Sequence, residues 1–171
     1  MFPCRIRRLT PADFEALAVF IGHHLPAMSV GWLEAQLGGP WQRGDGGAFV
    51  ALDRRHAIRA FGYFGRYSDE GVGVPGIWLR SIYTEPIARR LGLSRQLIEA
   101  LLATASAQGL REVHSDVRRD NAGSLNLHRK LGFVEVTREE LTAFVPLLER
   151  ARAAGRDLAV LRWRAAVGSG R

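Results

Sequence analysis

The loop before residue 93 is the first candidate site. In the segment TEPIARRLGLSRQLIEALL, Pro86 stops a strand, an arginine-rich loop follows, and a helix begins directly after Gly92. The first amides of a helix have no partner within it and lie at its positive dipole end, and a glycine lets the backbone approach a ligand closely. With Arg89 and Arg90 beside it, this turn favours phosphate oxygens as ligands. It lacks the glycine spacing and the Lys-Ser/Thr pair of a P-loop, so an ordinary strand-to-helix turn is the alternative.

His128 is the second candidate, in the stretch DNAGSLNLHRKLGF. Asn121 can cap a helix that runs through Leu131 and ends at Gly132. A histidine with an unperturbed pKa of about 6.5 can exchange a proton near neutral pH. The alternative is that His128 only packs on this helix beside Leu125, three residues back.

The composition excludes several kinds of site. The 171 residues suit one domain, expected over residues 1–165, with a flexible tail at residues 166–171. The single cysteine, Cys4, excludes internal disulfides, and the five histidines have no metal-ligand spacing, so we expect no metal. No apolar run is long enough to cross a bilayer and no signal peptide is visible, so we expect a cytoplasmic protein without a membrane partner.

The net charge of +7 and the pI near 10.8 come from arginine, since Lys130 is the only lysine. Such a charge can attract an anionic partner, either nucleic acid or a phosphorylated small molecule, or can simply form a solvated surface. The arginines are scattered along the chain and not clustered, so nucleic-acid binding is not expected.

The elements that position these residues are predicted from their periodicity. A strand followed by a helix is expected in RIRRLTPADFEALAVFIGHHL, and a second short helix in SVGWLEAQLGGPW. Alternating segments predict strands at residues 48–53, 57–67, 77–85, 111–117, 133–136 and 157–165. Three- and four-residue spacings predict helices at 93–108, 121–131 and 138–154, the last kinked or split at Pro146. This order indicates a single mixed α/β (α+β) domain.

These motifs resemble those of the GCN5-related N-acetyltransferase (GNAT) family. Arg89-x-x-Gly92-x-Ser94 is similar to its acetyl-CoA motif, which usually has Gln or Arg, two residues, Gly, one residue, and then Gly or Ala. Its second signature is an Asn-led helix that ends in a Gly-Phe pair. It is matched by Asn121, Ser124, Leu125, His128, Lys130, Gly132 and Phe133. The resemblance covers nearly the whole chain. It implies a twisted mixed β-sheet of about seven strands, flanked by helices and splayed between two central parallel strands.

The resemblance also implies a site for acetyl-CoA. The backbone of Ile82, Tyr83 and Thr84 would pair with the pantetheine arm, and Asn121 would contact its end. The pyrophosphate would lie on the loop formed by Arg89, Arg90, Leu91, Gly92, Leu93 and Ser94. Ser94 departs from the usual Gly or Ala, and its hydroxyl could cap the helix or touch a phosphate oxygen. His128 stands where many relatives have a tyrosine, close to the CoA sulfur, as a possible general acid.

The general base is not assigned by this resemblance. Relatives often place a glutamate on the strand that here spans 77–84, which contains no carboxylate. Glu85 lies at the end of that strand and Glu70 in a loop. On the next strand, His114 and Asp116 are further candidates.

The residues that would bind the acceptor are not assigned either. Trp32, Trp41, His23 and His24 fall in the N-terminal helices that line the acceptor cleft of related enzymes, and they could shape a pocket or pack in the core. The helix at 138–154 could cover the acceptor side or mediate a homodimer.

The implied function is direct transfer of an acetyl group from acetyl-CoA to a primary amine in a ternary complex. Cys4 is a poor covalent carrier, because it is distant from both motifs in the sequence. The alternative is a catalytically weak or inactive CoA-binding module with a regulatory role. The missing strand carboxylate and the missing tyrosine both favour that alternative.

Overall fold

One seven-stranded sheet runs through the protein. The computed structural model describes residues 4–26, 28–66 and 74–165, so the predicted tail at 166–171 lies outside the described residues. The strand order is β1-β2-β3-β4-β5-β7-β6, and only the β4–β5 pair is parallel. The strands are β1 (Arg5–Arg8), β2 (Gly46–Leu52), β3 (Ile58–Arg66), β4 (Ile77–Thr84), β5 (Glu112–Arg118), β6 (Val134–Glu135) and β7 (Leu158–Arg164). The predicted mixed sheet of about seven strands is confirmed.

Five α-helices accompany the sheet in the described residues. They are α1 (Phe14–His24), α2 (Val30–Gly38), α3 (Leu93–Ala107), α4 (Ala122–Lys130) and α5 (Val145–Ala153). The segment predicted as one helix at 138–154 is divided into a 3-10 turn, Glu140–Phe144, and α5. The division falls before Pro146 because proline is tolerated in the first turn of a helix but not in its interior.

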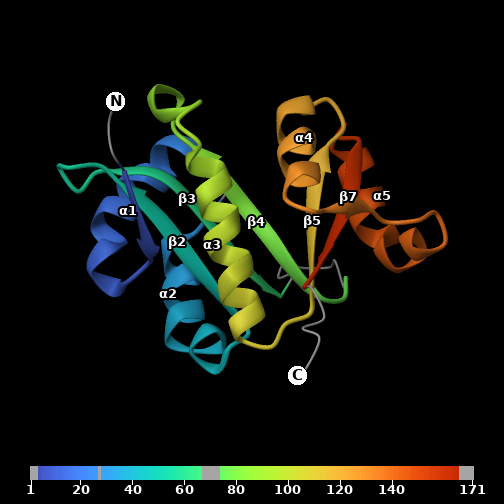
Figure 1. The fold of residues 1–171 in the computed structure, drawn as a ribbon, viewed down its shortest axis with the longest axis horizontal. Coiled ribbons are helices and arrows are strands. Elements are labelled where there is room, and N and C mark those ends of the chain that lie inside the picture. The colour runs from blue at the N-terminus through green and yellow to red at the C-terminus, as the bar shows by residue number, and fades with distance from the viewer. Residues whose placement is uncertain (1–3, 27, 67–73, 166–171) are drawn as a thin grey trace, which may run out of the picture.

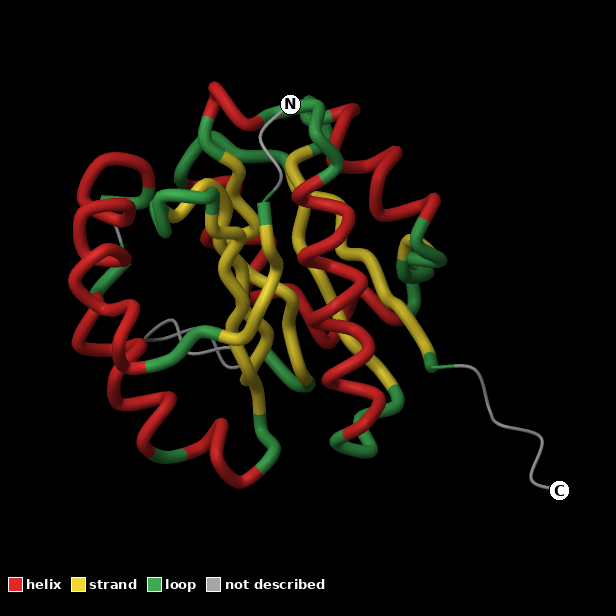
Figure 2. The backbone as a smooth tube through the Cα atoms, turned by 60° about the vertical axis from the view of Figure 1, so that its left-hand side comes forward, coloured by secondary structure: helices red, strands yellow, loops and turns green. Residues whose placement is uncertain are grey.

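The helices form two layers, one on each face of the sheet (Figures 1 and 2). On one face, α3 and α4 bury side chains such as Leu97, Leu101 and Leu125 in the largest core cluster. On the other face, α1 and α2 pack on β2 and β3, while α5 packs on β4 and β7. The two faces therefore have separate cores, with the sheet between them.

The parallel strands β4 and β5 separate soon after they meet. Their paired residues are Trp78 with His114 and Leu79 with Ser115. Beyond Leu79 the strands diverge toward their carboxyl ends, as Figure 1 shows. By contrast, β5 pairs with β7 along its whole length. The predicted splay between two central parallel strands is confirmed.

A β-bulge at Ser81 accompanies this separation. Tyr63 pairs with Arg80 and Phe61 with Tyr83, so three steps along β4 match two steps along β3. Ser81 is the extra residue of the bulge. Its φ is 52°, a value that is uncommon for residues other than glycine. The bulge thus removes one backbone position of β4 from the ladder with β3.

The bulge also exchanges the two faces of β4. Before it, Leu79 points to the α3 core and Trp78 to the opposite face. Strict alternation would send position 83 toward α3. After the bulge, Ile82 instead packs toward α3 and Tyr83 toward α1. This exchange determines which side chains of β4 face each helical layer.

None of the helices in the described ranges has the length and apolar character that crossing a membrane would require.

We expect Gly62→Ala to destabilise the fold. A Cβ atom at Gly62, opposite the bulge, would lie 2.3 Å from Cδ1 of Ile82. Forcing Ile82 to move should lower the free energy of unfolding by about 1–3 kcal/mol. The measurement is urea denaturation.

Gly22→Ala is the matched control, because no atom lies within 4 Å of a Cβ there and the position is helical. It should raise the free energy of unfolding by about 0.5–1 kcal/mol. Equal stability of Gly62→Ala and the wild-type protein would contradict tight packing over the bulge.

Candidate active site

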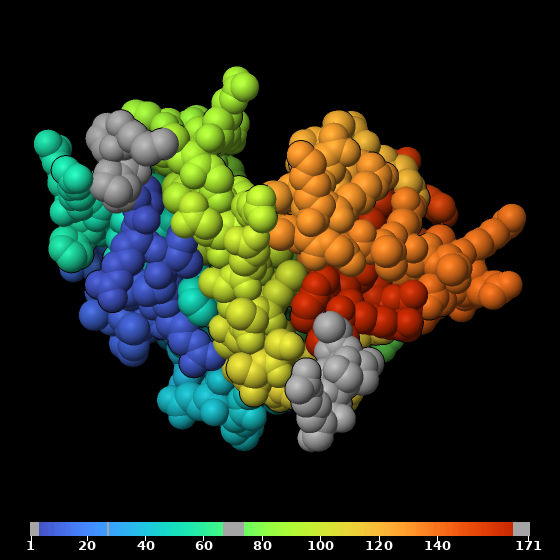
Figure 3. Space-filling model, viewed as in Figure 1, coloured from blue at the N-terminus to red at the C-terminus, as the bar shows by residue number. Residues whose placement is uncertain are grey.

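A cleft of about 710 Å³ opens where β4 and β5 separate. Its walls come from the end of β4, the loop before α3, the start of α3, and α4. In Figure 3 it is the notch between the yellow-green and orange surfaces. The lining includes Ile82, Tyr83, Thr84, Arg89, Arg90, Gly92, Leu93, Ser94, Asn121 and His128. Of the residues predicted to bind acetyl-CoA, only Leu91 is outside this lining, and its side chain packs against the α3 core.

One end of the cleft has free backbone amides. Gly92, the residue before α3, has φ of 78°, and Arg90 has φ of 65°. The first hydrogen bond of the helix runs from the amide of Gln96 to the carbonyl of Gly92. The amides of residues 93–95 therefore have no acceptor within α3. Amides in this position can hold an anion, and the phosphate site predicted for this loop stays a prediction.

The hydroxyl of Ser94 has a partner that the sequence did not indicate. Its Oγ lies 2.8 Å from Oγ1 of Thr84, and no side chain caps α3. Arg89 donates from Nε to the carbonyl of Thr84, and its guanidinium lies 5.9 Å from the ring centre of Tyr83. These contacts join the end of β4 to the start of α3, which fixes the floor of the cleft.

The wall formed by β4 offers backbone groups to the cleft. On one side, Tyr83 and Thr84 pair with Phe61 and Ala60 of β3. On the other side, the pairing with β5 within the described residues stops at Leu79. A sheet edge of this kind can form hydrogen bonds with an extended ligand.

His128 is buried, with 3% of its surface exposed. Its Nδ1 lies 2.8 Å from the carbonyl oxygen of Ser124, and its Nε2 lies 3.1 Å from Oγ of Ser115. A carbonyl oxygen only accepts, so Nδ1 carries the proton, and Nε2 of the neutral ring accepts from the Ser115 hydroxyl. Burial lowers the pKa of His128, against the opposing effects of the Ser124 hydrogen bond and the charge of Asp116.

This arrangement bears on the predicted role of His128 as an acid. The only proton of the neutral ring is already donated to the backbone of α4. Donation from Nε2 would require either an imidazolium, which burial disfavours, or the other neutral tautomer, which loses the hydrogen bond to the Ser124 carbonyl. The nearby Asn121 caps α4 as predicted, because its side chain accepts from the amide of Ser124 at 3.1 Å.

No carboxylate is among the described residues that line this cleft. Glu85 is engaged in an ion pair of 2.7 Å with Arg59. His114 is buried beside Trp78 and lies outside the lining, as does Asp116. Glu70 falls outside the described residues. The general base therefore stays unassigned.

A second cleft of about 710 Å³ lies on the opposite face of β4. It is lined by the junction of α1 and α2, by β3, by the bulge of β4, and by α5 and the residues after it. His24 and Trp32 are in this lining, whereas the exposed His23 is not. Arg150 of α5 is also in the lining, so the segment predicted at 138–154 covers part of this cleft. We call it the second cleft below.

Tyr83 and His24 connect the two clefts. Tyr83 lines the cleft between β4 and β5, His24 lines the second cleft, and Oη of Tyr83 lies 3.3 Å from Nδ1 of His24. Their rings stack with centres 5.1 Å apart. The sequence placed only the backbone of Tyr83 at the site. The orientation of its side chain depends on the bulge, for which the strand pattern gave no signal.

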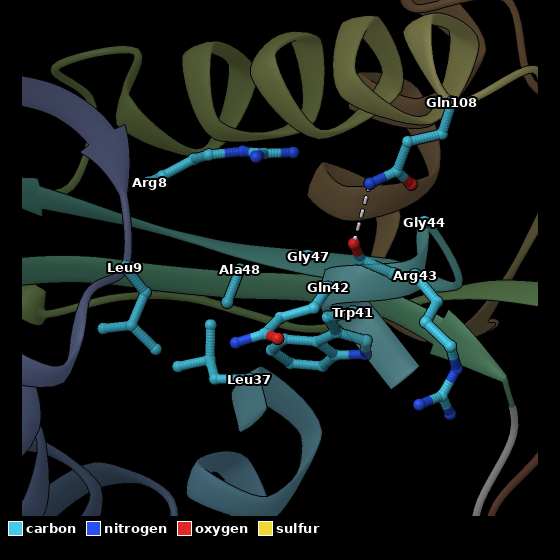
Figure 4. A pocket seen from close by; sticks show the side chains of 11 residues that line it. Arg8, Leu9, Leu37, Trp41, Gln42, Arg43, Gly44, Gly47, Ala48 and Gln108 are labelled. Atoms are coloured by element: carbon cyan, nitrogen blue, oxygen red, sulfur yellow. Dashed lines mark hydrogen bonds between the residues drawn. The ribbon is translucent and has the colours of Figure 1, made fainter. Parts of the chain in front are cut away.

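A third hollow of about 520 Å³ lies at the other end of the sheet, between β1, β2 and the end of α3 (Figure 4). Trp41 lines this hollow and is absent from the lining of the second cleft. Gln108 donates from Nε2 to the carbonyl of Gly46 at 3.1 Å. None of the residues predicted to bind acetyl-CoA lines it.

No group of three or more His, Cys, Asp or Glu side chains in the described part of the chain is arranged to hold a metal ion.

The chain resembles known acetyltransferases in sequence. The family model described as "Acetyltransferase (GNAT) family" matches residues 17–133. An L-methionine sulfoximine/L-methionine sulfone acetyltransferase of Pseudomonas paraeruginosa is 41% identical over 61 residues, which are 36% of each chain. An aminoglycoside N(6')-acetyltransferase type 1 of Serratia marcescens is 38% identical over 96 residues, 56% of this chain and 62% of that one. Each match thus spans less than two thirds of the relative.

The fold has a counterpart among solved structures. The ribosomal-protein-S18-alanine N-acetyltransferase from Escherichia coli superposes with a TM-score of 0.66 at 20% identity, over 99% of both chains. At this identity the likeness concerns the fold alone.

The protonation of His128 predicts a pH dependence of stability. Its pKa is lower in the folded protein than in the unfolded chain, so the unfolded chain binds the proton more readily. The free energy of unfolding should therefore fall as the pH drops below about 6.5. His128→Gln should remove this part of the fall, measured by urea denaturation between about pH 5 and 8.

His114→Gln is a parallel test and not an unaffected control, because burial also lowers the pKa of His114. Each variant should remove its own share of the slope. A His128→Gln curve parallel to that of the wild-type protein would contradict a neutral, buried His128.

Proposed function

The chain belongs to the acetyltransferase (GNAT) family, whose model matches well over half of it, and we propose that it transfers an acetyl group from acetyl-CoA to a primary amine. The relatives' names support an amine acceptor, since one of them is an aminoglycoside N(6')-acetyltransferase. The names divide between an amino acid derivative and aminoglycosides, so they do not select the acceptor.

One observation carries this proposal. The cleft between β4 and β5 combines free helix amides at one end with an unpaired strand edge along one wall. The amides and the arginines beside Gly92 suit a pyrophosphate, and the edge formed by residues 82–84 suits the amide groups of a pantetheine arm. CoA carries both groups, because its pyrophosphate is joined directly to its pantetheine arm.

Direct transfer fits the placement of the two clefts. Acetyl-CoA would supply the acyl group as a thioester. The amine nitrogen attacks the thioester carbonyl carbon, the C–S bond breaks, and CoA leaves as the thiolate. The nitrogen loses one proton and the thiolate gains one, so the products are the N-acetylated amine and the CoA thiol. The second cleft would hold the amine on the opposite face of β4, and the Tyr83–His24 contact lies where the two clefts meet.

A covalent route through Cys4 is disfavoured. Its thiol lies beside Arg59, Ile87 and Ala88, in a small separate hollow. Burial, followed by the charge of Asp53, raises the pKa of Cys4, so the reactive thiolate is rare at neutral pH.

His128 has a positioning role in this proposal. A thiolate with a pKa of about 8.5 is a fair leaving group without an acid. The side chain of His128 links α4 to β5 through Ser124 and Ser115, and so sets the wall opposite β4.

The second candidate function is a CoA-binding module without turnover. The lack of a carboxylate among the described residues that line the cleft between β4 and β5 favours this second function. It predicts binding of acetyl-CoA and no release of CoA thiol with any amine.

Gly92→Glu should abolish or strongly weaken binding of acetyl-CoA in calorimetry. It places a carboxylate next to the helix amides and forces a non-glycine residue to φ of 78°. We expect the affinity for acetyl-CoA to fall about tenfold or more, because the new carboxylate would repel the pyrophosphate that the helix amides attract.

Gly109→Glu is the matched control. Gly109 follows the other end of α3, has φ of 77°, and has no atom within 4 Å of an added Cβ. It brings the same strain and charge away from the cleft and should leave binding unchanged. Equal affinities of Gly92→Glu and Gly109→Glu, or no binding by the wild-type protein, would refute the cofactor assignment.

His128→Phe should lower kcat of thiol release by about tenfold or less, because general acid catalysis is worth more than that when it operates. The pH profile of kcat should keep its shape. A loss of about a thousandfold, with disappearance of one limb of the profile, would instead assign His128 as the acid.

A further inference from the structure

We propose that the acceptor is an amino acid, with a free carboxylate near the reacting amine and an apolar side chain. The inference rests on the proposed acetyl transfer and concerns what the second cleft selects.

Three arginines surround the second cleft. Arg80 comes from β4, Arg150 from α5, and Arg156 from the segment that follows α5. No Asp or Glu is among the described residues of its lining. A guanidinium binds a carboxylate through two parallel hydrogen bonds, which gives direction as well as charge.

The inference does not require these arginines to be otherwise free. Arg80 and Arg150 take part in further interactions. A guanidinium has five N–H donors in a fixed plane and can serve a second acceptor. The argument is the placement of three positive charges around one cleft from three separate segments.

Most of the remaining lining is apolar or aromatic, and its polar members are His24, Ser29 and Ser81. Leu25, Met28 and Trp32 line the cleft beside Tyr63. The rings of Trp32 and Tyr63 have centres 5.2 Å apart, and Trp32 also contacts Trp41 at 6.0 Å. The Trp32 and Tyr63 rings are tilted by 57° to each other, and together with the aliphatic side chains they offer a preformed surface to an apolar group.

The positions along β4 place the carboxylate near the amine. The bulge residue Ser81 lines the second cleft, and Arg80 is its neighbour in sequence. The amine has to reach the thioester across β4, close to this bulge and to Tyr83. A carboxylate bound to Arg80 therefore lies only a short distance from the amine, as in an amino acid.

A polycationic acceptor fits this cleft poorly. Each additional positive charge of the acceptor would meet three guanidinium groups of the same sign. Like charges repel each other, so the cleft discriminates against such amines.

The test compares acceptors that differ only in the carboxylate. CoA thiol release is measured with L-leucine, L-methionine and L-phenylalanine, with their amides, and with spermidine. We expect kcat/KM to be about tenfold or more higher for each acid than for its amide, since a charge-assisted pair is lost in the amide. A preference for the amides or for spermidine would overturn the inference.

Two variants locate the carboxylate. Arg80→Gln and Arg156→Gln should lower kcat/KM for the acids and leave it unchanged for the amides. Arg152→Gln is the matched control, because Arg152 is exposed on α5 and outside the lining of the cleft. An equal effect of all three variants on the acids would contradict the assignment.

A binding measurement separates this inference from the proposed catalysis. N-acetyl-L-phenylalanine and its amide are titrated into the protein with CoA present, and tryptophan fluorescence is followed. Selective binding of the acid, weakened in Arg156→Gln, supports the inference even if no amine is turned over. Equal binding of acid and amide, or binding of neither, overturns it, whereas failure of acetyl-CoA itself to bind refutes the proposed function.

Discussion

The pairing between β4 and β5 ends after two residue pairs, and the cleft between these strands depends on this limit. A parallel pair that continued to Thr84 would occupy the edge of β4 and close the space between α3 and α4. The bulge at Ser81 lies two residues beyond Leu79, the last residue of β4 that pairs with β5. It turns Tyr83 toward α1 and Ile82 toward α3, so one strand provides a backbone wall to one cleft and side chains to both.

Features that depend on neighbouring residues could be predicted from the sequence. The glycine before α3, the Asn121 cap and the strand that Pro86 ends are of this kind, because a turn or a cap is determined within a few residues. The hydrogen bonds of His128 could not be predicted, since Ser115 comes from another strand. The exchange of the two faces of β4 could not be predicted either. The bulge depends on the pairing with β3, while the sequence of β4 keeps an ordinary strand pattern.

The positive charge of the chain has a more specific distribution than its composition suggested. Some arginines form ion pairs, such as Arg7 with Asp13 and Arg59 with Asp53. Others are far apart in sequence and gather around a cleft, as Arg80 and Arg156 do. A scattered sequence pattern therefore does not exclude local clusters of arginine that the fold assembles.

The two clefts also differ in how their residues are distributed along the chain. The cleft between β4 and β5 is lined by residues from two stretches, 82–98 and 121–128, whereas the second cleft combines residues from 24 to 156. The family match ends at residue 133, before α5 begins. Among the described lining residues of the second cleft, only Arg150 and Arg156 lie beyond this match. Substitutions in α5 and in the segment after it can therefore change the charge of the second cleft without altering any residue that lines the cleft between β4 and β5.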